Sequence, residues 1–220
     1  MIYFIAAPPR SGTSMVANLL HQHGVWIGRT IAGDEHNEHG YFENVNMVGI
    51  TKRIMKGNGY YARADTELFV TWENVDKFEP LFLWKSIQKI VKKHDPWLYK
   101  DAKLLHLYPL FAKAFSDAIW ILPIRDTEKI LDSIGRHKIW QKRQREFEGS
   151  KEEFWQEMRD MVRRLKTRQG EIMSRSPHIM VSPNYLIQDS DYAEQFIGWC
   201  GLNWDKTAYD KAIDKRIWSG

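Results

Sequence analysis

Residues 2–14, Ile-Tyr-Phe-Ile-Ala-Ala-Pro-Pro-Arg-Ser-Gly-Thr-Ser, decide how the chain begins to fold. The apolar run at 2–7 is typical of a strand that is buried on both faces of a sheet. A short polar loop follows at 8–12, and apolar residues then recur at helical spacing from Met15 until Gly24 offers a stop. We therefore predict a strand, a tight loop and a helix in direct succession.

The rest of the chain alternates between helix-like and strand-like patterns. We predict helices at about 44–56, 80–93, 103–115, 127–139 and 190–200, and strands at 97–100, 118–124 and 178–181. Asp126 is expected to cap the helix at 127–139, and Ser150 with Glu153 forms a capping-box pattern ahead of a long helix. This alternation predicts one α/β domain over residues 1–220, with a P-loop-like parallel sheet covered by helices on both faces.

Composition limits the class of protein. Of the 220 residues, 43% are hydrophobic, which is enough for a core and excludes a disordered chain. The net charge of +4 is mildly basic and consistent with an anionic ligand. A lone cysteine, Cys200, can form neither an intramolecular disulfide nor a cysteine metal cluster, so we expect a reducing compartment. With no membrane-spanning or signal pattern, we expect a soluble, cytoplasmic protein.

Lysine and arginine are dense between residues 136 and 168. Acidic residues are interleaved with them, so the solvated side of two helices is the simpler interpretation. A docking surface for an anionic acceptor is the alternative. The chain carries neither paired zinc ligands nor RNA-binding aromatic motifs, and we expect no nucleic-acid partner.

The loop that joins the first strand to the first helix has the composition of an anion site. Such a junction presents unpaired backbone N–H groups and the positive end of the helix dipole. Gly12 lets the backbone approach a ligand closely, and Arg10 adds a fork of charged donors that suits phosphate or sulfonate oxygens. Hydroxyl donors stand at Ser11, Thr13 and Ser14. A purely structural turn is the alternative interpretation of this segment.

The same loop departs from the nucleoside-triphosphatase pattern G-x-x-x-x-G-K-[ST]. Ala7 stands at its first glycine position, and Thr13 stands at its lysine position. An ATPase or GTPase places that lysine on the β- and γ-phosphates, so the substitution argues against triphosphate chemistry. The cation lies instead two residues before Gly12, at Arg10.

With its cation in this place, Pro-Arg-Ser-Gly-Thr-Ser at 9–14 resembles the 5′-phosphosulfate loop of sulfotransferases that use 3′-phosphoadenosine 5′-phosphosulfate. The Arg-bearing form is found in tyrosylprotein and several bacterial members. Residues 121–133, Ile-Leu-Pro-Ile-Arg-Asp-Thr-Glu-Lys-Ile-Leu-Asp-Ser, resemble the family's 3′-phosphate motif, with Arg125 and Ser133 at the matching positions. An Arg at the end of a strand and a Ser on the next helix can converge on one phosphate. Alone, Arg125 could be a surface residue paired with an Asp.

Weaker resemblances extend the similarity over about residues 2–200. Gly-Tyr-Phe-Glu at 40–43 is similar to a segment common after the first helix of bacterial sulfotransferase-like proteins. Tyr-Lys-Asp-Ala-Lys-Leu at 99–104 resembles their Lys-Asp-Pro-Arg-Leu segment, from which Ala102 and Lys103 depart. Asn-Tyr-Leu at 184–186 is a diluted form of a Tyr-Glu-Asp-Leu stretch.

The resemblance implies a reaction and assigns roles. An acceptor hydroxyl or amine would attack sulfur in line, and adenosine 3′,5′-bisphosphate would leave. Arg10 and the loop amides would stabilise the charge that develops, without a metal. Glu43 is our candidate for the general base, with Glu35 and His36 as alternatives in a loop that also holds Asp34, Glu38 and His39. The implied nucleotide-binding set is Arg10, Ser11, Gly12, Thr13, Ser14, Arg125 and Ser133.

Two other functions stay open at this point. A small-molecule kinase with a degenerate phosphate loop would depend on magnesium. A non-catalytic nucleotide-binding protein would bind the bisphosphate without transferring sulfonate. The sequence leaves the acceptor open among carbohydrate, peptide tyrosine, lipid and small phenol, and it leaves the oligomeric state open as well.

Overall fold

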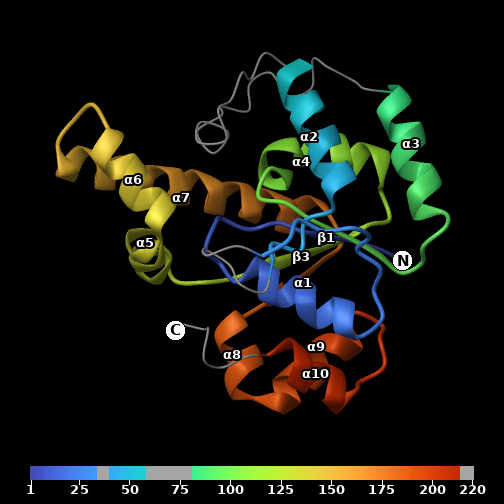
Figure 1. The fold of residues 1–220 in the computed structure, drawn as a ribbon. Helices are drawn as coiled ribbons and strands as arrows, with labels where there is room; N and C mark the ends of the chain where they lie inside the picture. Colours follow the sequence, from blue (N-terminus) through green and yellow to red (C-terminus); the bar gives the residue numbers. More distant parts are fainter. Residues whose placement is uncertain (34–39, 58–80, 214–220) are drawn as a thin grey trace.

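The computed structural model describes residues 1–33, 40–57 and 81–213. Within these residues, four strands form one parallel sheet in the order β2-β1-β3-β4 (Figure 1). The strands are β1 Ile2–Ile5, β2 Trp97–Lys100, β3 Ile119–Pro123 and β4 His178–Val181. Tyr3 of β1 is in register with Leu98 of β2 and with Ile119 of β3. The chain therefore passes from one side of β1 to the other between β2 and β3.

Ten helices connect and follow the strands in the described ranges. They are α1 Thr13–Gln22, α2 Val45–Gly57, α3 Leu81–Val91, α4 Leu104–Ala114, α5 Thr127–Arg136, α6 Lys138–Glu146, α7 Lys151–Arg175, α8 Pro183–Gln188, α9 Ser190–Trp199 and α10 Lys206–Ala212. Asp126 caps α5 by accepting hydrogen bonds from two backbone amides, and Ser150 and Glu153 form both bonds of the capping box, as predicted. The predicted end of α5 was wrong, because the extended backbone of His137 (φ −88°, ψ 122°) stops the helix at Arg136.

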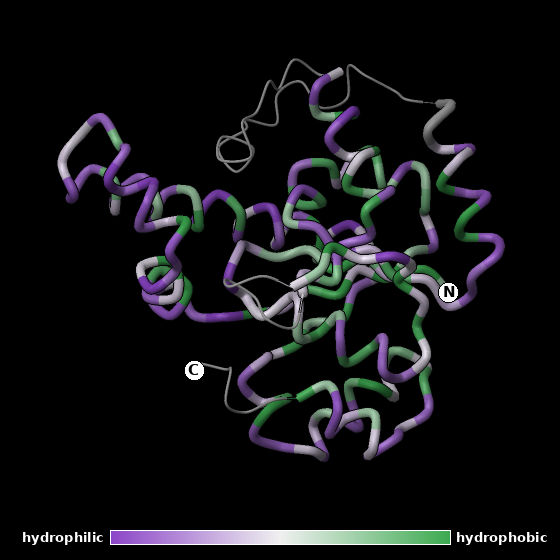
Figure 2. The backbone as a smooth tube through the Cα atoms, viewed as in Figure 1, coloured by the Kyte–Doolittle hydropathy of each residue, from purple (hydrophilic) through white to green (hydrophobic). Residues whose placement is uncertain are grey.

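Helices cover both faces of the sheet, which confirms the predicted fold class. Alternate residues of β1 point to opposite faces. Phe4 and Ala6 pack in a core with side chains of α2 to α7, whereas Tyr3 and Ile5 pack with α1 and α8 to α10. In Figure 1, α2 to α4 lie above the strands, α1 and α8 to α10 lie below them, and α5 and α6 lie to the left; Figure 2 shows that hydrophobic stretches of the chain are concentrated between the upper and lower helices.

The α6 helix and the first turns of α7 project from the rest of the molecule (Figure 1) and are largely hydrophilic (Figure 2). In α6, the Arg143 guanidinium lies 4.3 Å from the centroid of the Trp140 ring. The exposed pairs Lys142–Glu146 and Arg163–Asp160 join basic and acidic side chains along the helices. These pairs agree with the interpretation of the basic stretch as a solvated surface. Like the other described helices, α7 lacks the apolar length that a membrane crossing needs.

Candidate functional site

The loop between β1 and α1 has a constrained backbone. Gly12 occupies the N-cap position of α1 with φ +81°, and Arg10 has φ +65°, a conformation that costs a non-glycine residue about 1 kcal/mol or more. The amide of Ala6 donates to the carbonyl of Ile121 at 3.1 Å, which ties the start of the loop to β3. Gly12 has no side chain that could accept from the first amides of α1. Those amides and the helix dipole favour an anion here.

Two hydrogen bonds join this loop to the segment that follows β3. Arg10 Nε donates to Ser133 Oγ at 3.0 Å, and Arg125 Nη1 donates to the backbone carbonyl of Arg10 at 2.7 Å. Arg125 is 6% exposed and Ser133 is 3% exposed, so both side chains are held within the protein. We call Arg10, Arg125 and Ser133 the arginine–serine unit. It brings together residues that the sequence predicts for the two ends of a nucleotide.

The electrostatics of the arginine–serine unit are strongly positive. Burial lowers the pKa of Arg10, and the charge of Arg136 lowers it as well, whereas Tyr41 raises it. Burial also lowers the pKa of Arg125. Repulsion from Arg10 and Arg136 lowers it further, whereas the charge of Asp132 raises it. Guanidinium groups that repel one another favour a bound anion between them. The unit therefore has the charge and the donors of a phosphate-binding site.

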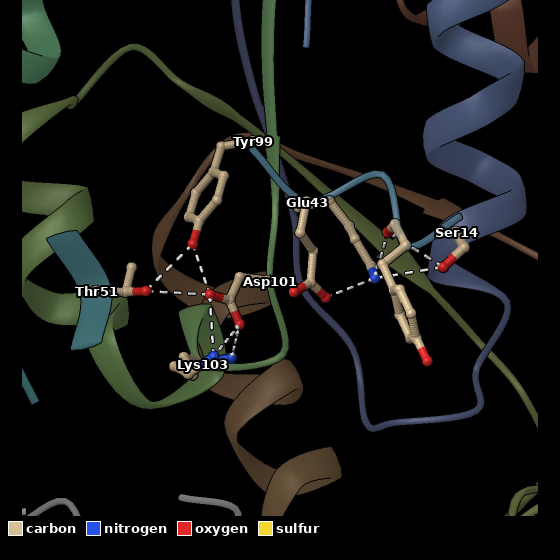
Figure 3. A network of polar contacts seen from close by, with 8 residues as sticks. Ser14, Glu43, Thr51, Tyr99, Asp101 and Lys103 are labelled. Atoms are coloured by element: carbon tan, nitrogen blue, oxygen red, sulfur yellow. Dashed lines mark hydrogen bonds and ion pairs between the residues drawn. The ribbon is translucent and has the colours of Figure 1, made fainter. Parts of the chain in front are cut away.

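A third cation, Lys100, stands at the end of β2, and β2 lies on the opposite side of β1 from β3. Its Nζ donates to Glu43 Oε1 at 2.9 Å, to the Tyr41 carbonyl at 3.0 Å and to Ser14 Oγ at 3.4 Å (Figure 3). The Lys100 side chain is 7% exposed and that of Glu43 is 19% exposed. The contacts place the predicted base, Glu43, close to the first turn of α1. The sequence analysis assigned no role to Lys100, although a cation at the end of a predicted strand was a usable signal.

A buried network holds the end of β2 in place (Figure 3). Asp101 accepts hydrogen bonds from the Tyr99 hydroxyl at 2.5 Å, from Thr51 Oγ1 at 3.2 Å and from the Lys103 amide at 2.9 Å. Burial would raise the pKa of Asp101, but the Lys103 charge and the hydrogen bonds from Tyr99 and Lys103 lower it below its ordinary value. Burial and the adjacent Asp101 charge raise the pKa of Tyr99. The network fixes the backbone on both sides of Lys100.

Gln169 of α7 supports the same edge of the sheet. Its Nε2 donates to the carbonyl of Pro123 at 3.0 Å and to that of Ala6 at 3.4 Å. Pro123 is the last residue of β3, shortly before Arg125. Ala6 directly follows β1, at the start of the loop. Gln169 is 6% exposed, so this bridge is internal. Sequence reasoning assigned it no role.

The predicted site residues differ in where they lie. Arg10, Arg125 and Ser133 contact one another, and Ser14 and Glu43 share contacts with Lys100. Thr13 begins α1 and is partly buried, whereas Ser11 is fully buried and its hydroxyl has no hydrogen-bond partner among the described residues. The other acidic and histidine candidates lie outside the described residues: Asp34, Glu35, His36, Glu38 and His39.

Solved structures of three sulfotransferases resemble this fold. A sulfotransferase domain from the curacin biosynthetic pathway has a TM-score of 0.58 and 12% identity, and the match covers 100% of this chain and 80% of that chain. Sulfotransferase STF9 from Mycobacterium avium has a TM-score of 0.55 and 14% identity, covering 96% and 66%. Sulfotransferase STF1 from Mycobacterium tuberculosis H37Rv has a TM-score of 0.52 and 12% identity, and the match covers 99% of this chain and 71% of that chain.

This chain has a sulfotransferase fold. The identities are too low to carry a substrate or an activity across from these proteins. No protein-family model and no curated protein sequence matches the chain. The function must therefore be argued from the site itself.

Proposed function

We propose that this sulfotransferase-fold protein moves a sulfonate group from 3′-phosphoadenosine 5′-phosphosulfate to a hydroxyl or amine acceptor. One observation carries the proposal, which is the arginine–serine unit. It joins the two predicted nucleotide motifs by hydrogen bonds at the carboxyl edge of a parallel sheet, where ligands of open α/β sheets bind. The likeness of the fold to three sulfotransferases supports the same conclusion.

In the proposed complex, the loop amides hold the 5′-phosphosulfate, and Arg125 and Ser133 hold the 3′-phosphate. Gly12 allows close approach, and the Thr13 and Ser14 hydroxyls add donors. We assign to Ser11 a backbone contact, because its side chain is fully buried. Arg10 contributes charge between the two phosphate positions. The mutual repulsion of the guanidinium groups, which a bound anion would relieve, supports this fit.

In the reaction, the acceptor oxygen or nitrogen forms a bond to sulfur while the bond from sulfur to the bridging phosphate oxygen breaks. Adenosine 3′,5′-bisphosphate leaves with the electron pair of that bond. Negative charge grows on the bridging oxygen, and Arg10 and the loop amides are arranged to stabilise it. Lys100, whose ammonium contacts Ser14 in the first turn of α1, adds a second cation on the β2 side.

Glu43 takes the acceptor proton in this proposal. Its carboxylate is held 2.9 Å from Lys100 and next to the loop, so that it lies near the position proposed for sulfur. Arginine, lysine and the helix dipole together supply the positive charge that magnesium supplies in kinases, and we propose a metal-independent reaction. Residues 1–220 would act as one catalytic domain.

Cellular location and partners stay predictions. We propose a cytoplasmic protein, because the sequence has a single cysteine, the buried Cys200, and therefore no intramolecular disulfide. The proposed partners are the nucleotide donor and one acceptor, without a nucleic acid.

Calorimetric titration without magnesium tests the donor. Adenosine 3′,5′-bisphosphate should bind about 10- to 100-fold more tightly than AMP, because charge-assisted hydrogen bonds to the 3′-phosphate are worth about 1.5–3 kcal/mol. Equal affinities, or binding that requires ATP with magnesium, would contradict the proposal and favour a kinase. Turnover is then measured as release of the bisphosphate from the phosphosulfate donor with carbohydrate, tyrosyl-peptide, lipid and phenol acceptors. Tight binding without turnover on any of them would indicate a non-catalytic nucleotide-binding protein.

A further inference from the structure

The conformation of Arg10 depends on residues from a distant part of the chain. Its backbone adopts φ +65°, which a non-glycine residue keeps only when its surroundings hold it there. Its carbonyl accepts from Arg125 and its side chain donates to Ser133. The backbone carbonyl and the side chain of Arg10 are therefore both held by the segment that the proposed function assigns to the 3′-phosphate.

That segment is well suited to hold the loop. Arg125 and Ser133 are almost fully buried, and α5, which carries Ser133, is capped by Asp126 and packed on the core through Ile130 and Ile134. A side chain that is fixed by packing on a capped helix can impose a backbone geometry on a neighbouring loop.

On the basis of the proposed function, we propose that Arg125 and Ser133 are positioning residues for the phosphate loop as well as ligands of the 3′-phosphate. The two ends of the donor then bind to one coupled unit, whose parts are joined through Arg10. Binding of the 3′-phosphate fixes the positions of Arg125 and Ser133. These residues in turn hold the loop in the conformation that presents its amides to the 5′-phosphosulfate. A donor without the 3′-phosphate loses turnover as well as affinity.

Independent subsites would behave differently from coupled ones. If the subsites were independent, AMP would be indifferent to Arg125 and Ser133, because it has no 3′-phosphate for them to contact. In the coupled unit, AMP senses both residues through the loop. AMP is therefore the probe that separates positioning from direct binding.

The central experiment is a double-mutant cycle on AMP affinity with four proteins: wild type, Ser133→Ala, Arg10→Ala and the double variant. Ser133→Ala should weaken AMP about three- to tenfold, as expected for the loss of a hydrogen bond. The same change in the Arg10→Ala background should have almost no effect, because the hydroxyl acts through Arg10. Equal factors in both backgrounds, or an AMP affinity within twofold of wild type in Ser133→Ala, would overturn the coupling.

Two further variants serve as controls. Arg125→Lys keeps the charge but changes the donor to the Arg10 carbonyl, and it should weaken AMP by a similar three- to tenfold factor. Arg136→Gln removes a neighbouring charge and measures the purely electrostatic effect, which should weaken AMP and the bisphosphate equally and by less than about threefold. If Arg125→Lys leaves the AMP affinity within twofold of wild type, the charge of Arg125 is sufficient and its positioning role is refuted.

A kinetic readout completes the test. At saturating donor, Ser133→Ala should lower kcat at least threefold in addition to raising KM, whereas loss of a 3′-phosphate contact alone would raise KM only. Melting temperatures establish that each variant is folded. The proposed function is tested separately, by the preference of the wild type for the bisphosphate over AMP. If that preference is present and the AMP cycle is additive, the coupling fails and the sulfotransferase proposal stands.

Discussion

Replacing Glu43 with Gln removes the carboxylate that we propose as the base but keeps a side chain of almost the same size beside Lys100. The Gln carbonyl oxygen can still accept from the Lys100 ammonium, which contacts Glu43 Oε1 at 2.9 Å in the structure. Lys100 also keeps its contacts with Ser14 and the Tyr41 carbonyl. The substitution therefore tests proton transfer with little change in the position of the neighbouring groups.

The expected magnitude follows from the contacts. A positioned general base contributes about 10²- to 10⁴-fold to a rate, so kcat should fall by that factor. The ion pair is only partly buried, with exposed fractions of 7% for Lys100 and 19% for Glu43. Its loss should cost between the values for exposed and for buried pairs, about 1–3 kcal/mol, which a domain with about 5–15 kcal/mol of stability tolerates. Bisphosphate affinity should stay within a few-fold of wild type.

The assay compares kcat with bisphosphate affinity for the wild type and for Glu43→Gln. Glu146→Gln, the same chemical change in the exposed Lys142–Glu146 pair of α6, is the matched control and should keep wild-type turnover. A kcat for Glu43→Gln within tenfold of wild type would refute the assignment. Glu35 and His36 would then be the next bases to test.

Three further substitutions address the loop and its supports. Arg10→Ala should lower turnover at least about 10²-fold with a nearly unchanged melting temperature, and turnover within tenfold of wild type would contradict the role of the loop. Asp101→Asn should lower the free energy of unfolding in urea at pH 7 by about 3 kcal/mol, because it leaves buried donors without their charged partner. The pKa of Asp101 is lowered by folding, so the wild-type advantage is present above the ordinary pKa and disappears as pH falls through the lowered value. An advantage that does not shrink as the pH falls below the ordinary pKa of an aspartate would contradict this cause. Gln169→Leu should cost about 1–3 kcal/mol in the same assay and weaken the bisphosphate, because two buried carbonyls lose their donor, whereas unchanged affinity would limit Gln169 to stability.

The sequence was sufficient to predict the sheet and most helices, because their apolar periodicity is strong. The helices that it did not predict are those with little periodicity to detect. In α6 only Trp140 is buried, while α8 and α10 have six and seven residues. The end of α5 was misplaced because His137 has no feature in the sequence that forbids a helix.

The site was predictable where a motif spans it and unpredictable where a contact depends on tertiary structure. Arg125 and Ser133 followed from one continuous segment. Lys100 acts on an atom 86 residues away and Gln169 on one 46 residues away, through hydrogen bonds that sequence spacing does not encode. Gln169 did leave a signal, since it stands in line with the buried residues Leu165 and Ile172 on α7. A polar side chain in an apolar stripe usually has an internal partner.

The strand order explains why cations converge on the loop and suggests how a ligand would be oriented. Because β1 lies between β2 and β3, the loop that follows β1 has the end of β2 on one side and the end of β3 on the other. Each of these strands delivers one cation, so that Lys100 contacts Ser14 on the β2 side and Arg125 contacts the Arg10 carbonyl on the β3 side. A 3′-phosphate bound by Arg125 and Ser133 must then lie over β3, which leaves the β2 side, with Glu43, for the acceptor. The direction in which the proposed donor binds is therefore a consequence of the strand order β2-β1-β3. If the donor bound in the opposite direction, its reacting atoms would lie far from Glu43.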